Sequence, residues 1–225
     1  MADIKQLNSY AFQEQQLQQQ QRYPRHGQGH PLPPLVGMEL LQKVSKDHDP
    51  LAYNFRDHFH EGPTVKTMHI LKNKNLVLLY FGGAWCGSCQ RFLPKLKAFY
   101  TQAQSAHAKV EVIYVSADRD TMEFQRTFGS MPWLAVDFES PHCRTLLTRK
   151  FHVGNIPTVV VLDAQTGDFI TDSACDDITE TGKARQKSSD EGGNKVDLLL
   201  AKWMTAEKVP IEDSKFAGSI GCQIL

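Results

Sequence analysis

The sequence has no excess of charge of either sign and no hydrophobic run long enough to cross a membrane. Its 225 residues include 25 Lys+Arg and 25 Asp+Glu, so the formal net charge is zero. A general nucleic-acid binder would show a basic excess, so we expect no nucleic-acid partner. A membrane-spanning helix needs about 20 consecutive apolar residues, and no stretch of the sequence approaches that length.

The sequence also shows no export signal at its start. Residues 1–5 lead into polar sequence instead of the apolar core of a signal peptide. Ala2 stands where N-myristoylation requires glycine. We therefore expect a cytoplasmic location. Because the cytosol keeps thiols reduced, the five cysteines are not expected to form structural disulfides.

Shifts in composition divide the chain into five predicted segments. Residues 1–36 are rich in Gln, His and Pro and are predicted to be a disordered arm, because such a segment buries too little apolar surface to fold. Residues 37–178 form the predicted globular domain. They are followed by a polar linker at 179–194, an amphipathic helix at 195–207 and a flexible tail at 208–225. We expect the helix to dock on the globular domain, with partner or membrane binding as the alternative.

Strands and helices alternate through the globular segment. Residues 76–81 form a continuous apolar run that ends at two glycines, which is typical of a central strand buried on both faces. The elements expected after it are a helix with its apolar face at 92–100, a strand at 110–115, a helix at 121–128 with Asp120 as its N-cap, a helix at 143–151, and strands at 158–162 and 169–171 that form a hairpin. This order predicts an α/β fold with a mixed central sheet and helices on both faces.

Two cysteines in a Cys-x-x-Cys motif follow the first buried strand. Cys86 falls at the expected start of the helix, where unpaired backbone N–H groups and the helix dipole stabilise a thiolate. A thiolate is the attacking species in disulfide exchange. Gly87 and Ser88 place Cys89 about one turn further on, where it can attack a mixed disulfide and release the reduced substrate. The motif therefore predicts thiol–disulfide exchange, with Cys86 as nucleophile and Cys89 as resolving thiol.

A zinc site is the competing interpretation of the motif. Its other ligands would have to come from His142, Cys143 and Cys175, because the sequence has no second Cys-x-x-Cys and no His-x-x-x-His. Neither Cys143 nor Cys175 has an activating pattern of cations near it. We expect a small, half-buried residue at Cys143, an exposed bystander thiol at Cys175, and neither a metal nor a bound cofactor.

The motif and its surroundings resemble the thioredoxin superfamily. The residues that carry the resemblance are Tyr80-Phe-Gly-Gly-Ala-Trp-Cys-Gly-Ser-Cys89, Pro94 and Ile156-Pro157-Thr158. It implies a thioredoxin fold in which Trp85 lies beside the dithiol. It also implies a cis peptide bond before Pro157, which turns the backbone at Ile156 toward the dithiol to pair with a substrate strand.

Further motifs narrow the resemblance to the tryparedoxin and nucleoredoxin branch, over residues 65–172. They are Met131-Pro-Trp-Leu-Ala-Val136, Phe138, Phe151 and Val153. This branch implies reduction of protein disulfides such as those of peroxiredoxins, with trypanothione as the external dithiol donor. It also has Tyr at the position of Tyr80, where thioredoxins carry a buried Asp. A buried Tyr cannot act as a base near neutral pH, so Tyr80 is either a packing residue or an indirect participant.

The sequence departs from this branch at several positions. Gly87-Ser88 replaces a Pro-Pro pair, Ala117 replaces a Trp, and Ser173 and Cys175 stand where relatives carry arginines that face the donor. These changes weaken the expectation of trypanothione as donor. They also keep a second function open, that of a non-catalytic, redox-sensitive adaptor resembling nucleoredoxin.

The last four residues, Cys222-Gln-Ile-Leu225, match a prenylation box whose terminal Leu favours a geranylgeranyl group. They predict lipidation at Cys222 and association with the cytosolic face of a membrane. A free thiol is the alternative. The second membrane signal is weak, because Lys215 is offset by Glu212 and Asp213, and a single lipid chain anchors a protein only reversibly.

Overall fold

The computed structural model describes residues 32–42, 64–184 and 195–211. Within them, a seven-stranded sheet has the order β2-β1-β5-β4-β3-β6-β7. The strands are β1 (Glu39–Leu41), β2 (Thr64–Lys66), β3 (Leu76–Gly82), β4 (Val110–Ser116), β5 (Leu134–Ala135), β6 (Thr158–Asp163) and β7 (Phe169–Thr171). β3 runs parallel to β4 and antiparallel to β6, which confirms the predicted mixed sheet.

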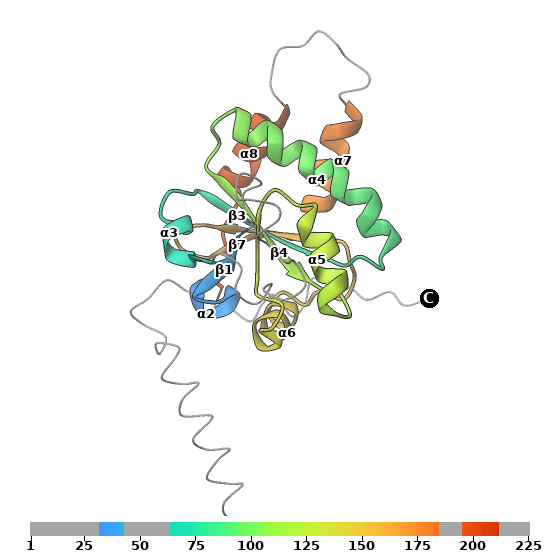
Figure 1. The fold of residues 1–225 in the computed structure, drawn as a ribbon. Coiled ribbons are helices and arrows are strands. Elements are labelled where there is room, and N and C mark those ends of the chain that lie inside the picture. Colours follow the sequence, from blue (N-terminus) through green and yellow to red (C-terminus); the bar gives the residue numbers. More distant parts are fainter. Residues whose placement is uncertain (1–31, 43–63, 185–194, 212–225) are drawn as a thin grey trace, which may run out of the picture.

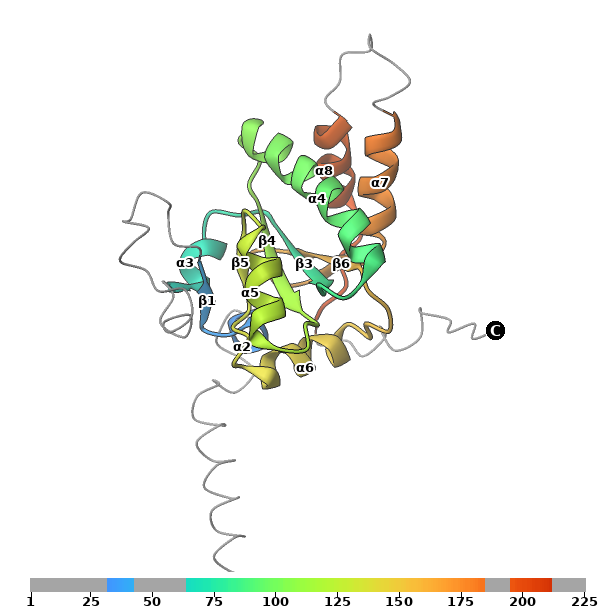
Figure 2. The same ribbon diagram turned by 45° about the vertical axis from the view of Figure 1, so that its right-hand side comes forward.

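Helices cover both faces of the sheet. They are α2 (Leu32–Val36), α3 (Thr67–Leu71), α4 (Gly87–Ser105), α5 (Thr121–Gly129), α6 (Pro141–Lys150), α7 (Ala174–Ala184) and α8 (Lys195–Thr205). α4, α7 and α8 lie on one face, and α2 and α6 lie on the other (Figures 1 and 2). This layered arrangement is that of the thioredoxin fold.

The central strand β3 has apolar side chains on both faces of the sheet, so both faces need a covering layer of helices. Its side chains alternate between the two faces, as the pleat of a strand requires. Leu78 and Tyr80 join the core beneath α4, whereas Leu79 and Phe81 join the core above α6. The apolar run that predicted a strand buried on both faces therefore supplies both hydrophobic cores.

The local signals in the sequence account for helix α5. Asp120 was a predicted N-cap, and its side-chain oxygen accepts a hydrogen bond from the Glu123 backbone N–H at 2.8 Å. Phe124 and Phe128, one turn apart, are buried. α5 therefore begins and packs where the pattern placed it.

The structure corrects three of the predicted segment boundaries. α2 lies within the predicted disordered arm, where the side chains of Leu32 and Val36 are buried next to α6. α7 extends through Ala184 into the predicted linker. Val209, in the predicted flexible tail, pairs with Phe169 of β7. The remaining parts of these segments lie outside the described residues.

The predicted C-terminal helix docks on the globular domain. The apolar face of α8 is buried against α4 and α7, and Trp203 is only 1% exposed. The Trp203 indole N–H donates to Asp177 Oδ2 of α7 at 2.9 Å, and its ring packs on Phe99 of α4. None of the helices in the described ranges is both long and apolar enough to cross a bilayer.

Candidate active site

The junction between β3 and α4 carries the two motif cysteines. It passes through Gly82 and Gly83, where the backbone approaches other groups closely. A Cβ on Gly82 would lie 2.6 Å from Tyr80 Oη, and one on Gly83 would lie 2.9 Å from Trp85 Nε1. Both distances are below any normal contact, so a Cβ at either position would force the neighbouring aromatic side chain to shift. The turn places Cys86 as the N-cap of α4.

The thiol of Cys86 is partly exposed and lies between two backbone groups. Its Sγ accepts a hydrogen bond from the Cys89 backbone N–H at 3.1 Å and donates to the Ile156 carbonyl oxygen at 3.5 Å. The first contact remains available when the thiol loses its proton, and it then stabilises the negative charge. Cys86 thus has the exposure and the hydrogen bonding of a nucleophile.

Cys89 occupies a different environment, although only two residues separate it from Cys86. Its side chain is buried, with 2% exposed. Burial, followed by the hydrogen bond with Cys86, raises the pKa of the Cys89 thiol to about 12. Cys89 is therefore protonated near neutral pH and shielded from a bulky substrate, as a resolving thiol should be.

The predicted cis-proline loop faces this dithiol. The Ile156–Pro157 peptide bond is cis, as the sequence predicted. It precedes β6 and brings the Ile156 carbonyl oxygen to the Cys86 sulfur. The loop and the helix N-terminus therefore meet around Cys86, although 70 residues separate them.

Trp85 forms the exposed wall of the site. Its side chain is 47% exposed. The indole N–H donates to the Ala117 carbonyl oxygen at 2.8 Å, and the Arg119 guanidinium lies 5.3 Å from the ring centroid. The hydrogen bond fixes the ring, so that it presents a rigid apolar surface next to Cys86.

A buried carboxylate holds this wall in place. Asp118 accepts hydrogen bonds from the Ala84 backbone N–H, the Tyr114 hydroxyl and the Ser116 hydroxyl. Both side-chain hydroxyl contacts are 2.7 Å. Asp118 therefore ties the end of β4 to the loop that leads into Cys86. Sequence reasoning did not identify this role; the signal was an Asp directly after a buried strand.

Tyr80 is a core residue beside the resolving thiol. Its ring packs against Phe92, Tyr114 and Trp133. Burial raises the pKa of the Tyr80 hydroxyl well above its usual range, so it does not ionise near neutral pH. Its hydrogen bond with Cys89 lowers the pKa of that thiol, although burial outweighs this effect. Tyr80 therefore packs the core and also donates to Cys89.

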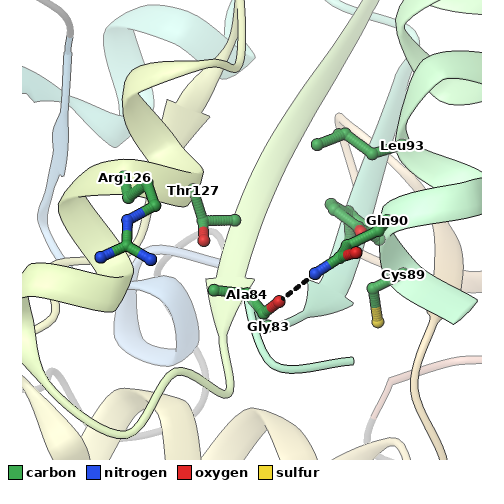
Figure 3. Close-up of a pocket in the computed structure, with 8 residues that line it drawn as sticks. Gly83, Ala84, Cys89, Gln90, Leu93, Arg126 and Thr127 are labelled. Carbon is green, nitrogen blue, oxygen red and sulfur yellow. Dashed lines mark hydrogen bonds between the residues drawn. The ribbon is translucent and has the colours of Figure 1, made fainter. Parts of the chain in front are cut away.

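A shallow pocket of about 220 Å³ opens between α4 and α5 (Figure 3). It is lined by Tyr80, Gly83, Ala84, Cys89, Gln90, Leu93, Arg126 and Thr127. The Gln90 side-chain amide donates to the Ala84 carbonyl oxygen at 2.7 Å and braces its rim. The Cys89 sulfur points away from Arg126 and Thr127. The pocket thus borders the active-site turn, and Cys89 is one of its lining residues.

Two other cysteines have surroundings that differ from the predictions. Cys143 is buried at 4% exposure, and not half-buried. Cys175 is not exposed; it lies half-buried in the first turn of α7, and its Sγ donates to the Pro157 carbonyl oxygen at 3.7 Å. Burial raises the pKa of the Cys175 thiol to about 12. The β6–β7 hairpin therefore brings Cys175 beneath the cis-proline loop.

The ligands of the alternative zinc site do not form a cluster. Among the described residues, no group of three or more His, Cys, Asp or Glu side chains is placed to hold a metal ion. Cys143 belongs to α6 on one face of the sheet, whereas Cys86 and Cys89 begin α4 on the other (Figure 2). The arrangement of the two motif thiols suits disulfide exchange.

Comparisons with known proteins agree with this geometry. A family described as thioredoxin-like matches residues 73–169. Probable nucleoredoxin 1 of Arabidopsis thaliana is 41% identical over 103 residues, which are 46% of this chain and 17% of that protein. The nucleoredoxins matched are thus several times longer than the segment they share with this chain.

Solved structures of tryparedoxins match a larger share of their own length. Tryparedoxin I from Leishmania major is 32% identical, with a TM-score of 0.51 over 57% of this chain and 88% of that one. Tryparedoxin II complexed with glutathionylspermidine is 25% identical, with a TM-score of 0.53 over 69% of this chain and 94% of that one. With the dithiol, the cis-proline loop and the mixed sheet in their expected places, the chain belongs to the tryparedoxin and nucleoredoxin branch of the thioredoxin superfamily.

Proposed function

We propose that this protein is a thiol–disulfide oxidoreductase that reduces protein disulfides through Cys86 and Cys89. The observation that carries the proposal is the asymmetry of the two thiols. Cys86 is accessible and accepts a hydrogen bond from a backbone N–H, whereas Cys89 is buried with a raised pKa. Disulfide reduction needs one thiol that attacks the substrate first and a second thiol that stays protonated until it resolves the mixed disulfide.

The reaction proceeds in two exchanges. The Cys86 thiolate attacks one sulfur of a substrate disulfide, a Cys86–substrate disulfide forms, and the other substrate sulfur leaves as a thiolate that takes up a proton. Cys89 then loses its proton and attacks Cys86 Sγ, which forms the Cys86–Cys89 disulfide and releases the second substrate thiol. Two electrons pass from the protein dithiol to the substrate disulfide, and no metal or bound cofactor takes part.

The walls of the site suit an extended substrate. Trp85 offers an apolar surface on one side of Cys86, and the cis-proline loop offers backbone groups at Ile156 on the other. An extended peptide that pairs with this loop presents its disulfide to Cys86, since strand pairing satisfies the backbone groups of both chains. Peroxiredoxins are the proposed class of protein substrate.

An external dithiol must regenerate the reduced protein. Polyamine–glutathione conjugates such as trypanothione are the proposed donors, because the tryparedoxin II structure contains glutathionylspermidine. Ser173 and Cys175, however, occupy the positions where arginines were expected. Ser173 bridges Val159 of β6, and Cys175 contacts the Pro157 carbonyl, so both positions adjoin the cis-proline loop. We therefore propose a weaker preference for trypanothione than tryparedoxins have.

Trapping experiments test the proposed roles. Cys86→Ser should abolish reduction of insulin and of a peroxiredoxin, whereas Cys89→Ser should accumulate a mixed disulfide on Cys86 that mass mapping detects. Cys143→Ser, which alters a buried thiol in α6, is the matched control and should do neither. Trapping through Cys89 in the Cys86→Ser variant would reverse the assignment.

The choice of donor is tested separately. Reduction of the same substrates is driven by trypanothione, by glutathione or by dithiothreitol at equal thiol concentration. Activity with dithiothreitol and weak activity with trypanothione is the expected result. A trypanothione rate equal to that of a tryparedoxin measured alongside would contradict the weaker preference, but it would leave the dithiol chemistry intact.

A redox-sensitive adaptor is the second candidate function. Leu198 and Met204 of α8 are 66% and 44% exposed, although the opposite face of this helix is buried. They offer apolar surface to a partner. The similarity to nucleoredoxins is a second reason to consider an adaptor function. An adaptor would bind its partner stoichiometrically in one redox state and show no turnover. Multiple turnovers of a disulfide substrate per protein molecule would exclude this function.

A lipid on Cys222 would place this chemistry at a membrane surface. Cys222 lies outside the described residues, so the proposal rests on the Cys222-Gln-Ile-Leu225 motif. Burial of a prenyl chain in the bilayer stabilises the membrane-bound state by about 0.8 kcal/mol per CH₂. We propose attachment to the cytosolic face of a membrane.

A further inference from the structure

Two arginines flank Cys86. The Arg119 guanidinium lies over the Trp85 ring at 5.3 Å. The Arg91 Nη2 donates to Ser88 Oγ at 3.1 Å, and Arg91 Nη1 lies 3.7 Å from where a Cβ on Gly87 would stand. These contacts hold one guanidinium against Trp85 and the other against the Gly87-Ser88 turn, on either side of Cys86.

Neither guanidinium is neutralised within the described part of the chain. The ion pairs found there join lysines to Glu111, Asp177 and Asp163. The three carboxylates nearest in sequence to Arg119 have backbone and hydroxyl partners instead. Asp118 is buried and accepts from Ala84, Tyr114 and Ser116. Asp120 accepts from the Glu123 backbone N–H, and Glu123 accepts from the Arg119 backbone N–H. Apart from the Arg91 Nη2 that donates to Ser88, the guanidinium donors of both residues remain available to an incoming group.

Two further acidic side chains lie beyond the cis-proline loop. Asp172 and Asp176 belong to the segment that runs from β7 into α7. In the sheet, β4, which precedes Arg119, and β7 are on opposite sides of β3. Arg119 and these two carboxylates thus follow strands on opposite sides of β3.

We infer that Arg91 and Arg119 form a carboxylate-recognising subsite of the dithiol site, which selects protein disulfides whose cysteine is flanked by acidic residues. This inference rests on the proposed reductase function and names its substrate class. Guanidinium groups bind carboxylates through paired N–H donors. A substrate carboxylate beside Trp85 is attracted by Arg119 and one beside the Gly87-Ser88 turn by Arg91, whereas a lysine at either place is repelled. The same subsite disfavours polycationic donors, in line with the weak use of trypanothione proposed above.

Single-turnover reduction of designed cystine peptides tests the inference without any donor. The fully reduced protein is mixed with peptides that are identical except for Glu, Gln or Lys on either side of the cysteine, and released peptide thiol is followed. The Glu peptide should react fastest and the Lys peptide slowest. The Glu-to-Gln rate ratio within one variant cancels any effect of a substitution on the dithiol itself.

The variants assign the selectivity to the two arginines. Arg91→Gln and Arg119→Gln should each lower the Glu-to-Gln ratio about threefold, as expected for one exposed ion pair, and Arg→Lys at either position should restore part of it. Lys109→Gln removes an exposed cation at the opposite end of β4 and should leave the rates unchanged. Salt near 1 M, where the Debye length falls to about 3 Å, should bring the ratios close to one.

The outcomes separate the inference from the function on which it rests. Equal rates for all three peptides, or selectivity that survives both Arg→Gln changes, would overturn the subsite. Glutathione disulfide, which carries carboxylates but is not a protein segment, is reduced in parallel. If it reacts faster than all three peptides and these react at equal rates, the assignment to protein disulfides is overturned. No reduction of any peptide by the wild-type protein would instead remove the proposed function itself.

Discussion

At the scale of single residues, the site shows how two identical side chains acquire different chemistry. Cys86 and Cys89 lie in the same helical turn, but Cys86 is at the surface and Cys89 is beneath it. Burial dominates the rise of the Cys89 pKa to about 12, and the Tyr80 hydroxyl partly offsets it. The step that needs the Cys89 thiolate should therefore be the pH-sensitive one.

The second exchange should accelerate with pH across pH 7–10, because each pH unit below the Cys89 pKa changes the thiolate fraction about tenfold. The measurement is the decay of a preformed mixed disulfide between Cys86 and thionitrobenzoate. Tyr80→Phe removes a donor to the Cys89 sulfur and should slow the decay at each pH. A rate that levels off below pH 9 would show that Cys89 ionises far more readily than its burial indicates.

Cys175 should make the reduced protein less stable in alkali. Its pKa is raised from 9.0 to about 12 by burial, so the folded protein keeps a proton that the unfolded chain has lost in this range. The stabilisation is complete below pH 9 and is lost as the pH rises toward 12, at a slope of about 1.4 kcal/mol per pH unit.

Urea unfolding of the reduced wild-type protein and of Cys175→Ala, at intervals between pH 8.5 and 11, measures this effect. The difference between the two proteins isolates the single thiol from other groups that titrate there. The variant should lose stability less steeply with pH. Parallel curves would mean that Cys175 ionises as readily in the folded protein as in the unfolded chain.

At the scale of elements, the sequence predicted those whose signal is local. The continuous apolar run at 76–81 predicted β3 to within one residue, and the Asp120 cap predicted α5. The sequence did not predict β1, β2, β5, α2 and α3, because two to five residues are too few to show a period. Nor did it predict α7, because the residues from 179 onward were interpreted as part of a polar linker. It also missed the carboxylate of Asp118 and the buried position of Cys175, since both depend on contacts between distant segments: Asp118 meets Ala84, and Cys175 meets Pro157.

Helix α8 should stabilise the fold without taking part in the chemistry. Its Trp203 donates to Asp177 and packs on Phe99, and the neighbouring Lys202 pairs with the same Asp177 carboxylate at 2.7 Å. Trp203→Phe keeps an aromatic ring but removes the N–H, so it should lower the free energy of unfolding by about 1–2 kcal/mol.

Denaturant unfolding and disulfide-reduction kinetics, measured on the same samples, check this prediction. Leu198→Ala changes a 66% exposed position on the same helix and should alter stability little. A normal free energy of unfolding for Trp203→Phe would show that its indole N–H contributes nothing to docking of α8. A loss of reduction rate in a folded variant would instead give α8 a functional role.

At the scale of the whole molecule, the sheet lies between two hydrophobic cores, and the dithiol follows only one of the two ends of β3. Gly82 and Gly83 lead to the dithiol there, whereas Leu76 at the other end pairs with Val110 and Asp163. The formal net charge is zero, so the domain itself has little attraction for an anionic bilayer. Membrane binding should therefore depend almost entirely on the lipid proposed at Cys222.

Expression in cells that contain a prenyltransferase should place the protein in the membrane fraction, and Cys222→Ser should return it to the supernatant. Cys143→Ser is the matched control and should fractionate as the wild-type protein does. Intact mass of the C-terminal peptide reports the modification directly. An unmodified Cys222 would defeat the anchoring proposal, and membrane binding that survives Cys222→Ser would point to Leu198 and Met204 of α8.

The pairing of Val209 with Phe169 sets the direction in which the chain leaves the domain toward Cys222. Phe169 pairs with Leu162, which pairs with Val77 near the start of β3, and Val209 runs antiparallel to β7. The chain therefore heads toward the pole of the sheet opposite Cys86 when it reaches Ile211. The eleven residues from there to Cys222 span at most about 40 Å. A lipid on Cys222 would therefore attach to a chain that leaves the described domain at the pole opposite the dithiol, with these eleven residues as the tether.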